Sequence, residues 1–306
     1  MESSLIDISI IIPTYNRSSR IKDTLLSVKN QTYSSFECIV VDDGSADASE
    51  TRAVVESMGD PRFRYIYQAN AGASKARNTG IDSAAGKFVC FLDSDDVFLP
   101  HKLERQYNKI SEYKNALIFS QLLVDRGVEK KWIKPPRGPK SGERVDEYLM
   151  CTSGWMQTST LMLNTNVARS VRFNEMLPSS QDTDFAIRCV NAGAVPVFIE
   201  EPLIVLNDVY DPSRVSKQTK YQPLLDWIEN MRHTQISEKS YWGYRGWQCS
   251  RVASYSNKGL AVKLFFSSFI RGSYSAKQSI IILAQILISR QLYQNIATMV
   301  VRLSGK

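Results

Sequence analysis

The segment from Lys87 to Asp96, KFVCFLDSDD, joins a short apolar run directly to a cluster of carboxylates. The run is aromatic and β-branched and follows a break at Gly86, so it predicts a buried β-strand. Open α/β sheets bind ligands beyond the carboxyl ends of their strands, where these acids are expected to lie. The spacing of Asp93 and Asp95 suits a hard divalent cation that also shares phosphate oxygens. Taken alone, the same acids could form a solvated turn or cap the next helix.

The first hundred residues alternate between predicted strands and predicted helices. Strands are expected at residues 8–12, 36–41, 63–67 and 88–92, and helices near 21–28, 48–58 and 75–78. This alternation predicts an α/β fold with a parallel sheet wound with helices. Polar clusters follow three of the strands, at residues 13–16, 42–43 and 93–95. If these strands are neighbours in one sheet, the three clusters share one edge.

Each cluster offers a different contact to a nucleotide. Tyr15 could stack on a base, although ordinary packing at the sheet edge explains an aromatic residue there equally well. Asp43 could accept a hydrogen bond from a base N–H, and Arg77 could meet a diphosphate. Asp93 could bind ribose hydroxyls while Asp95 binds a metal ion. Each of these contacts is a weak indication by itself.

Four stretches of the chain resemble glycosyltransferase family 2, the large inverting family with the GT-A fold. They are SIIIPTYNR at residues 9–17, VVDDGSAD at 40–47, GASKARNTGI at 72–81 and AAGKFVCFLDSDD at 84–96. Their order and spacing match the family as well as their wording, over the first third of the chain. The resemblance implies a Rossmann-like, mostly parallel sheet flanked by helices. It also implies a nucleotide-sugar donor, usually UDP-linked, bound through Mn²⁺ or Mg²⁺.

The resemblance carries over to individual residues. Pro13 and Tyr15 would frame the base, and Asp43 would hold it by a hydrogen bond. Arg77 would lie near the base or the phosphates. Asp93 and Asp95 would be the family's DxD pair, which binds the sugar nucleotide and the metal.

A second acidic cluster, at residues 178–188, resembles the family's Glu-Asp-x-Asp motif at the start of a helix. Gln181 replaces the first acid here, while Asp182 and Asp184 remain. In relatives the second position carries the general base, so the match points to Asp182. An inverting transfer needs one base that takes the acceptor hydroxyl proton, without an enzyme-bound sugar intermediate. The alternative is that both acids only decorate a helix N-terminus, where the helix dipole favours them.

The remaining part of the first 217 residues follows no repeat. Residues 99–113 predict a helix, and residues 116–124, 158–163 and 195–199 predict strands. Residues 125–144 are basic and contain several Pro and Gly residues, which favours a solvated surface loop over a binding lid. Residues 211–217 stand where relatives have a loop that closes over the diphosphate, so Arg214 is expected to bind phosphate. Leu206 and its neighbours lack the aromatic and basic residues common in the family there, which weakens this assignment.

Charge is distributed unevenly along the chain. Thirteen Lys and Arg residues after Ser216 face three acids, a net charge of +10, whereas the preceding part has 25 bases and 28 acids, or −3. Helices predicted near 221–231, 241–255, 261–270 and 279–303 interleave these bases with long aliphatic side chains, as interfacial helices do. This interleaving favours an anionic membrane surface over nucleic acid. A helical subdomain packed on the sheet explains the pattern equally well, so we divide the chain into a catalytic domain, 1–217, and a helical region, 218–306.

The five cysteines are scattered without a CxxC pair, which argues against a disulfide framework or a zinc site and fits a reducing compartment. The first residues show no secretory signal, and no apolar run reaches the ~18 residues that a spanning helix needs. These features predict a cytoplasmic protein that is peripheral at the inner face of the cell membrane.

Together the sequence predicts a metal-dependent inverting glycosyltransferase that moves a sugar from a nucleotide-sugar, with UDP favoured, to a hydroxyl group. The expected acceptor is a glycan or lipid-linked glycan of a bacterial exopolysaccharide or lipopolysaccharide pathway. A nucleotide-binding dehydrogenase would require G-x-G-x-x-G after the first strand, where this chain has Pro13-Thr-Tyr-Asn-Arg17. A non-catalytic nucleotide-sugar or membrane-binding protein on the same scaffold is the alternative. The presence of both the DxD pair and the base favours the enzyme.

Overall fold

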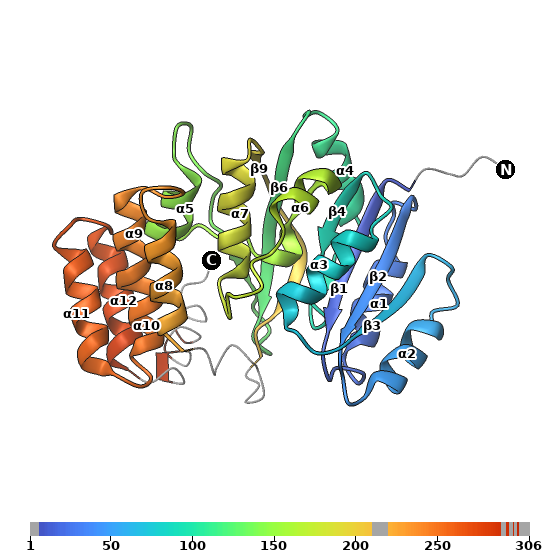
Figure 1. Ribbon diagram of the computed structural model, residues 1–306, viewed down its shortest axis with the longest axis horizontal. Helices are drawn as coiled ribbons and strands as arrows, with labels where there is room; N and C mark the ends of the chain where they lie inside the picture. Colours follow the sequence, from blue (N-terminus) through green and yellow to red (C-terminus); the bar gives the residue numbers. More distant parts are fainter. Residues whose placement is uncertain (1–5, 210–219, 289–291, 294–295, 297–298, 300–306) are drawn as a thin grey trace.

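A computed structural model describes residues 6–209, 220–288, 292, 293, 296 and 299 of the 306-residue chain. The described residues form a sheet covered by helices on both faces, with a group of helices at one end (Figure 1). The strands are β1 (Ile8–Thr14), β2 (Phe36–Asp43), β3 (Phe63–Gln68), β4 (Phe88–Phe91), β5 (Val97–Phe98), β6 (Ala116–Asp125), β7 (Trp132–Lys134), β8 (Met162–Asn164) and β9 (Val195–Asn207). The helices before residue 210 are α1 (Ile21–Lys29), α2 (Ala48–Glu56), α3 (Ala73–Ser83), α4 (Lys102–Ile110), α5 (Val145–Cys151), α6 (Thr165–Val171) and α7 (Gln181–Asn191). Those after residue 219 are α8 (Gln222–Met231), α9 (Glu238–Tyr244), α10 (Ser250–Ala253), α11 (Lys258–Phe269) and α12 (Ala276–Leu287), with a π-helical segment at Arg245–Cys249.

The sheet has the order β3-β2-β1-β4-β8-β6-β9-β5, and β7 pairs with β6. The first four strands in this order run parallel, as the strand–helix alternation predicts. The other half is mixed, because β8 runs antiparallel to β4 and β6 while β6 and β9 are parallel. The predicted α/β architecture of the GT-A type is confirmed, with an all-parallel order in one half of the sheet and a mixed order in the other.

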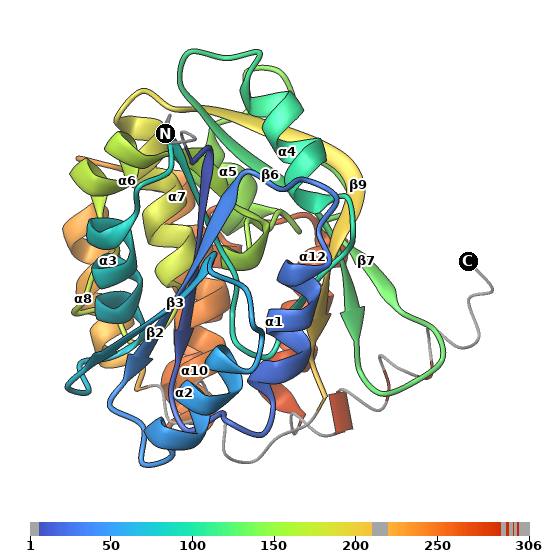
Figure 2. The ribbon, with the colours of Figure 1, turned by 90° about the vertical axis from the view of Figure 1, so that its right-hand side faces the viewer.

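The alternating side chains of the central strands supply two apolar cores. Ile11 on β1 faces the core formed with α3, α6 and α7, whereas Ile10 and Ile12 face the core formed with α1, α2 and α4. Figure 2 shows α3, α6 and α7 on one side of the sheet and α1 and α4 on the other. Strands buried on both faces read as continuous apolar runs, which is why the first strand could be identified from its sequence.

Several local predictions are wrong, each for a physical reason. Residues 158–160 form a 3₁₀ turn instead of a strand, because the Gln157 side chain accepts the Ser159 N–H at 2.6 Å and the Thr160 hydroxyl donates to the Gln157 carbonyl at 2.6 Å. Only β8 continues the sheet there. The predicted loop at 125–144 contains β7, which pairs with β6, and β9 continues to Asn207 past the predicted end at residue 199.

The C-terminal helices share a core with the sheet. Trp227 and Ile228 of α8 and Ile282 and Ile286 of α12 are buried in the same apolar cluster as Ile11. The packed-subdomain interpretation therefore holds for these faces of the helices. The domain boundary predicted between residues 217 and 218 lies outside the described residues. None of the described helices is long and apolar enough to cross a membrane.

Candidate active site

The three polar clusters meet at one edge of the sheet, as predicted. Thr14, the last residue of β1, pairs with Asp42 near the end of β2. On the other side of β1, the Leu92 N–H donates to the Ile11 carbonyl at 3.0 Å, so β4 delivers Asp93 to the same edge. This edge carries the carboxyl ends of three parallel strands, where α/β sheets bind ligands.

The corner after β1 is held to the corner after β2. Asn16 has a left-handed backbone, with φ of 51°, and its N–H donates to the Ser45 hydroxyl at 2.9 Å. The Asn16 side-chain oxygen accepts the Ala46 N–H at 2.8 Å. This corner leaves the Tyr15 side chain 44% exposed, so its ring is accessible to a planar ligand. Pro13 is buried and pairs with Val41 in the sheet, so it supports the corner from beneath.

Asp43 is buried at the end of β2 and organises the loop before α3. Its two oxygens accept the Gln68 amide at 2.6 Å and the N–H groups of Ala71 at 2.9 Å and Gly72 at 2.8 Å. A carboxylate has about four lone-pair positions, so these contacts leave capacity for one further donor. The predicted contact between Asp43 and a base N–H stays a prediction.

Arg77 of α3 connects the DxD pair to the second acidic cluster. Its guanidinium donates to Asp93 Oδ1 at 2.7 Å and to Gln181 Oε1 at 2.8 Å. The side chain is buried, and its Nε has no hydrogen-bond partner among the described residues. Gln181, which replaces an acid of the family motif, therefore presents a neutral oxygen to Arg77. A carboxylate at position 181 would neutralise Arg77 further, so Gln181 leaves more of the positive charge of Arg77 available to an anionic ligand.

Two residues that the sequence analysis missed hold the acids after β4. The Gln157 amide donates to both Asp93 and Asp96 at 3.2 Å. The Ser159 hydroxyl donates to Asp96 at 2.8 Å and accepts the Asp93 N–H at 3.0 Å. Gln157 directly precedes the strand that was expected at residues 158–163, and Ser159 lies within it, so the sequence assigned neither residue to the site. Asp96 itself is buried and has a structural role, whereas Asp95 is partly exposed.

These acids fit a divalent cation. The pKa of Asp96 is raised well above its usual value by burial and by the negative charges of Asp93 and Asp95, so the cluster has an excess of negative charge. The part of the chain that the structure describes contains no group of three or more His, Cys, Asp or Glu side chains arranged around a metal position. Mg²⁺ sites in enzymes that bind phosphates use one or two carboxylates plus phosphate oxygens and water, so two acids suffice.

The two acids of α7 have different environments. Asp184 is buried, accepts the Trp227 indole N–H at 2.8 Å and the Arg188 Nε–H at 2.9 Å, and so ties α7 to α8. Asp182 is partly exposed in the first turn of α7, and its Oδ1 accepts the Thr183 N–H at 2.8 Å. Only Asp182 is therefore available to a substrate hydroxyl.

The environment of Asp182 favours its neutral form. Burial raises the pKa of its carboxyl, while the hydrogen bond from the Thr183 backbone, the positive charge of Arg77 and the nearby Trp155 side chain oppose this shift. A carboxylate with a raised pKa binds protons more strongly, as a general base requires. Ser180, which precedes the helix, is in a left-handed conformation and accepts the Tyr244 hydroxyl at 2.8 Å. Neither Trp155 nor Tyr244 was identified from the sequence.

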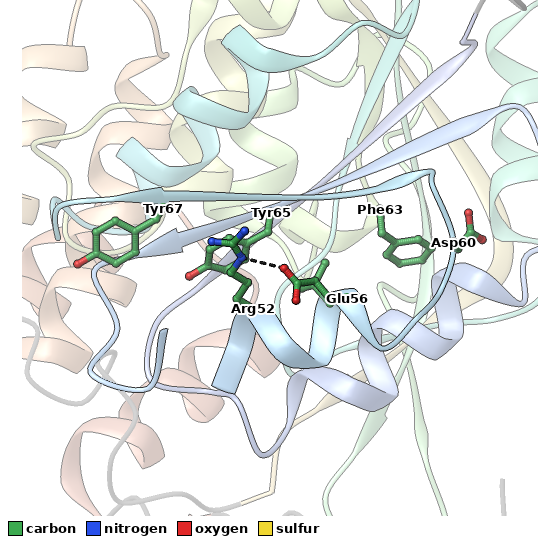
Figure 3. Close-up of a pocket in the computed structure, with 7 residues that line it drawn as sticks. Arg52, Glu56, Asp60, Phe63, Tyr65 and Tyr67 are labelled. Atoms are coloured by element: carbon green, nitrogen blue, oxygen red, sulfur yellow. Dashed lines mark hydrogen bonds and ion pairs between the residues drawn. The ribbon is translucent and has the colours of Figure 1, made fainter. Parts of the chain in front are cut away.

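Two further features lie outside this constellation. Arg214, the predicted phosphate partner, is outside the described residues. A cavity of about 410 Å³ lies between α2 and β3, where the Arg52–Glu56 ion pair is seen (Figure 3). None of the predicted site residues lines it, although the Tyr65 hydroxyl donates to Asp42 at 2.9 Å. It is a groove on the outer side of the sheet, separate from the DxD pair.

Residues 9–168 match the family model described as glycosyl transferase family 2. The chain belongs to glycosyl transferase family 2. The matched range contains the strand ends, the Asp43 corner, Arg77 and the DxD pair, and the family identifies the protein as a transferase enzyme. The base candidate in α7 lies beyond the matched range.

Relatives of known sequence agree with this assignment. The chain is 30% identical over 274 residues to the amylovoran biosynthesis glycosyltransferase AmsB of Erwinia amylovora, covering 86% of this chain and 90% of that protein. It is 32% identical over 203 residues to an uncharacterized glycosyltransferase of Rickettsia conorii, covering 65% of this chain and 33% of that protein. The match thus spans about a third of the Rickettsia relative's length.

Solved structures share the fold. TarS of S. aureus, residues 1–349 in complex with UDP-GlcNAc, superposes with a TM-score of 0.65 at 18% identity, covering 97% of this chain and 91% of that chain. The mannosyltransferase PcManGT from Pyrobaculum calidifontis, in complex with GDP-Man and Mn²⁺, has a TM-score of 0.59 at 15% identity. The match covers 96% of this chain and 79% of that chain. Both coverages include the C-terminal helical region of this protein.

Proposed function

We propose that the protein is a metal-dependent inverting glycosyltransferase that transfers a sugar from a nucleotide-sugar to a hydroxyl of a glycan or lipid-linked glycan. The observation that carries the proposal is the Arg77 guanidinium, which joins Asp93 of the DxD pair to Gln181 at the start of α7. The proposal combines this Arg77 network with Asp95 of the DxD pair and with the base candidate Asp182, which follows Gln181 in α7. A non-catalytic binding protein would not need the accessible carboxylate of Asp182.

Each residue has a defined role in the proposed reaction. Tyr15 stacks on the base and Asp43 accepts its N–H, while the positive charge of Arg77 attracts the diphosphate. Asp95 and Asp93 would hold Mn²⁺ or Mg²⁺, which when bound would neutralise charge on the diphosphate leaving group. Asp182 takes the proton of the acceptor hydroxyl as that oxygen attacks the sugar carbon. One direct displacement with no enzyme-bound sugar inverts the configuration at that carbon.

Relatives support the substrate class. AmsB is named for amylovoran biosynthesis, which supports a role in polysaccharide biosynthesis. TarS was solved with UDP-GlcNAc and PcManGT with GDP-Man and Mn²⁺, so donors with either nucleotide are candidates, and we favour UDP. Exopolysaccharide or lipopolysaccharide synthesis would supply a glycan or lipid-linked acceptor.

The test is a screen of UDP- and GDP-sugars by thermal shift and donor hydrolysis, with and without Mn²⁺. We expect one donor to raise the melting temperature only when the metal is present. A ligand that binds only the native protein and is present at 100 times its Kd adds about 2.7 kcal/mol to the free energy of unfolding, which is readily measured. Absence of metal-dependent stabilisation by every donor would contradict the proposed function.

We also propose that the enzyme works at the cytoplasmic face of the membrane, attached by its C-terminal helices. Apolar side chains are exposed on either side of the turn that joins α11 to α12, with Ile270 74% and Ile280 70% exposed. The basic residues Arg271 and Lys277 are exposed beside them. Each basic residue near an anionic leaflet contributes about 1 kcal/mol, and the attraction fades within a Debye length.

Replacement of Ile270 and Ile280 by Gln is expected to reduce co-sedimentation with anionic liposomes while the melting temperature is unchanged, because both side chains are exposed. Truncation after Ser273 would be a poorer test, since it would remove the buried Ile282 and Ile286 and unfold the core. High salt should weaken binding of the unmodified protein. Ile133→Gln is the matched control, because this isoleucine is 51% exposed on β7. Equal binding to neutral vesicles at every salt concentration would contradict the proposal.

A further inference from the structure

A second cavity lies between the segment that leaves α5 and the turn between α11 and α12. Its volume is about 610 Å³, within the range of roughly 300–1,000 Å³ typical of small-molecule sites. Residues 136–137, 151–154 and 272–275 line it together with Lys239 and Gln278. None of the residues assigned to the donor or the base lines this cavity.

Two polar side chains in this cavity have no protein partner. Ser273 is only 2% exposed, and its hydroxyl makes no hydrogen bond to the described residues. The Gln278 amide nitrogen is likewise buried without a hydrogen-bond partner among them. A buried polar group without a partner destabilises the folded protein, so two of them in one cavity indicate a polar ligand that completes their bonds.

The charges around the cavity are already neutralised. The Arg137 guanidinium binds Glu143 at 2.6 and 2.9 Å, and Lys239 Nζ binds Glu147 at 2.7 Å. The unsatisfied groups are a neutral hydroxyl and a neutral amide, so the site offers little excess charge to an anion. Hydroxyl and amide groups beside the Tyr274 ring suit a neutral polyhydroxylated molecule, whose hydroxyls both donate and accept and whose C–H face packs on an aromatic ring.

The cavity shares supporting elements with the base. Tyr274 donates to the Gly243 carbonyl of α9, and the next residue, Tyr244, donates to the Ser180 hydroxyl before α7. On the opposite wall, Gly154 precedes Trp155, whose side chain lies near enough to the Asp182 carboxyl to influence its pKa. A ligand in the cavity would therefore touch the same two segments that position the catalytic carboxylate.

We propose that this cavity binds a sugar unit of the acceptor glycan, other than the unit whose hydroxyl is glycosylated. The proposal rests on the proposed glycosyltransferase function and extends it to recognition of the acceptor chain. Ser273 and Gln278 supply the hydrogen bonds and Tyr274 the apolar surface. Because Ser273 lies in the turn between α11 and α12 and Gln278 lies in the first turn of α12, the C-terminal helices select the acceptor.

The test uses the full chain and a panel of neutral disaccharides, lactose, cellobiose, maltose and N,N′-diacetylchitobiose, observed by saturation-transfer NMR without donor. We expect at least one disaccharide to bind, and its affinity to fall about fivefold or more in Ser273→Ala and in Gln278→Leu, as for loss of one hydrogen bond. Neither variant should lower the melting temperature, because neither side-chain group bonds to the described protein. Donor hydrolysis should be unchanged.

Ser250→Ala is the matched control, because this buried hydroxyl donates to the Ala261 carbonyl at 2.7 Å and does not line the cavity. It should lower the melting temperature and leave disaccharide binding unchanged. The proposal is overturned if no disaccharide binds, if binding survives both cavity substitutions, or if Ser273→Ala destabilises the fold like the control. Since the binding experiment contains no donor, failure of the proposed function would appear separately, as loss of every donor-dependent shift.

Discussion

Asp95→Ala is expected to lower donor turnover by about 10²-fold or more, because several kcal/mol of charge stabilisation would be lost with the metal ligand. Asp95 lies partly exposed at the sheet edge, beside the buried Asp96. Its negative charge contributes to the raised pKa of Asp96, so its removal relieves repulsion within the cluster. The variant should therefore remain folded, so that the loss of turnover reports on the site.

The measurements are donor hydrolysis and the metal-dependent thermal shift produced by the donor. Asp93→Ala is less informative, because the Asp93 carboxylate also neutralises the buried Arg77 and its loss should lower stability. Glu56→Ala is a suitable control, since this acid forms an exposed ion pair with Arg52 on α2 and such pairs contribute about 0–1 kcal/mol. Metal-dependent donor binding that persists in Asp95→Ala would refute the metal assignment.

The sequence was informative where local pattern and burial coincide. β1, β2 and β4 are buried on both faces, so their apolar runs and the polar residues after them were visible in the sequence, and the register confirms the shared edge. The sequence was uninformative where tertiary contacts decide the structure. β5 is two residues long and exists only because it pairs with β9. No local pattern could predict it.

The same limit applies to the site. Gln157 and Ser159 are distant in sequence from the acids that they hold, and a polar run before an apolar segment has no signature of this role. The spacing of the acids in α7 does not by itself distinguish a structural acid from a reactive one, and only the resemblance to the family motif pointed to Asp182. Asp182 and Asp184 are two residues apart in the same helix turn, and only the Trp227 and Arg188 contacts distinguish them.

Asp182→Asn is expected to lower glycosyl transfer by at least about 10²-fold, the low end of general-base contributions, while donor and metal affinity are kept. The substitution should not destabilise the fold, because burial disfavours the charged form of Asp182 and the amide has no charge. For the unmodified enzyme, the base must be deprotonated. The transfer rate should therefore be constant at high pH and fall as the pH is lowered through the pKa of Asp182. Because this pKa is raised, the fall should begin at a higher pH than for an ordinary Asp, whose pKa is about 3.9.

Asp184→Asn provides the decisive contrast. Its carboxylate pairs with Arg188 and accepts the Trp227 indole in the core between α7 and α8, so removal of its charge should cost roughly 3 kcal/mol of folding stability. Urea unfolding and the transfer rate, measured for both variants, separate the two roles. Asp182→Asn should lower the transfer rate without changing the free energy of unfolding, whereas the main effect of Asp184→Asn should be a lower free energy of unfolding. An Asp182→Asn enzyme with nearly full activity, beside an inactive but fully folded Asp184→Asn, would assign the base to Asp184 instead. The asymmetry between these two acids makes the test sharp, because Asp184 is buried and accepts hydrogen bonds from Trp227 and Arg188, while Asp182 is partly exposed.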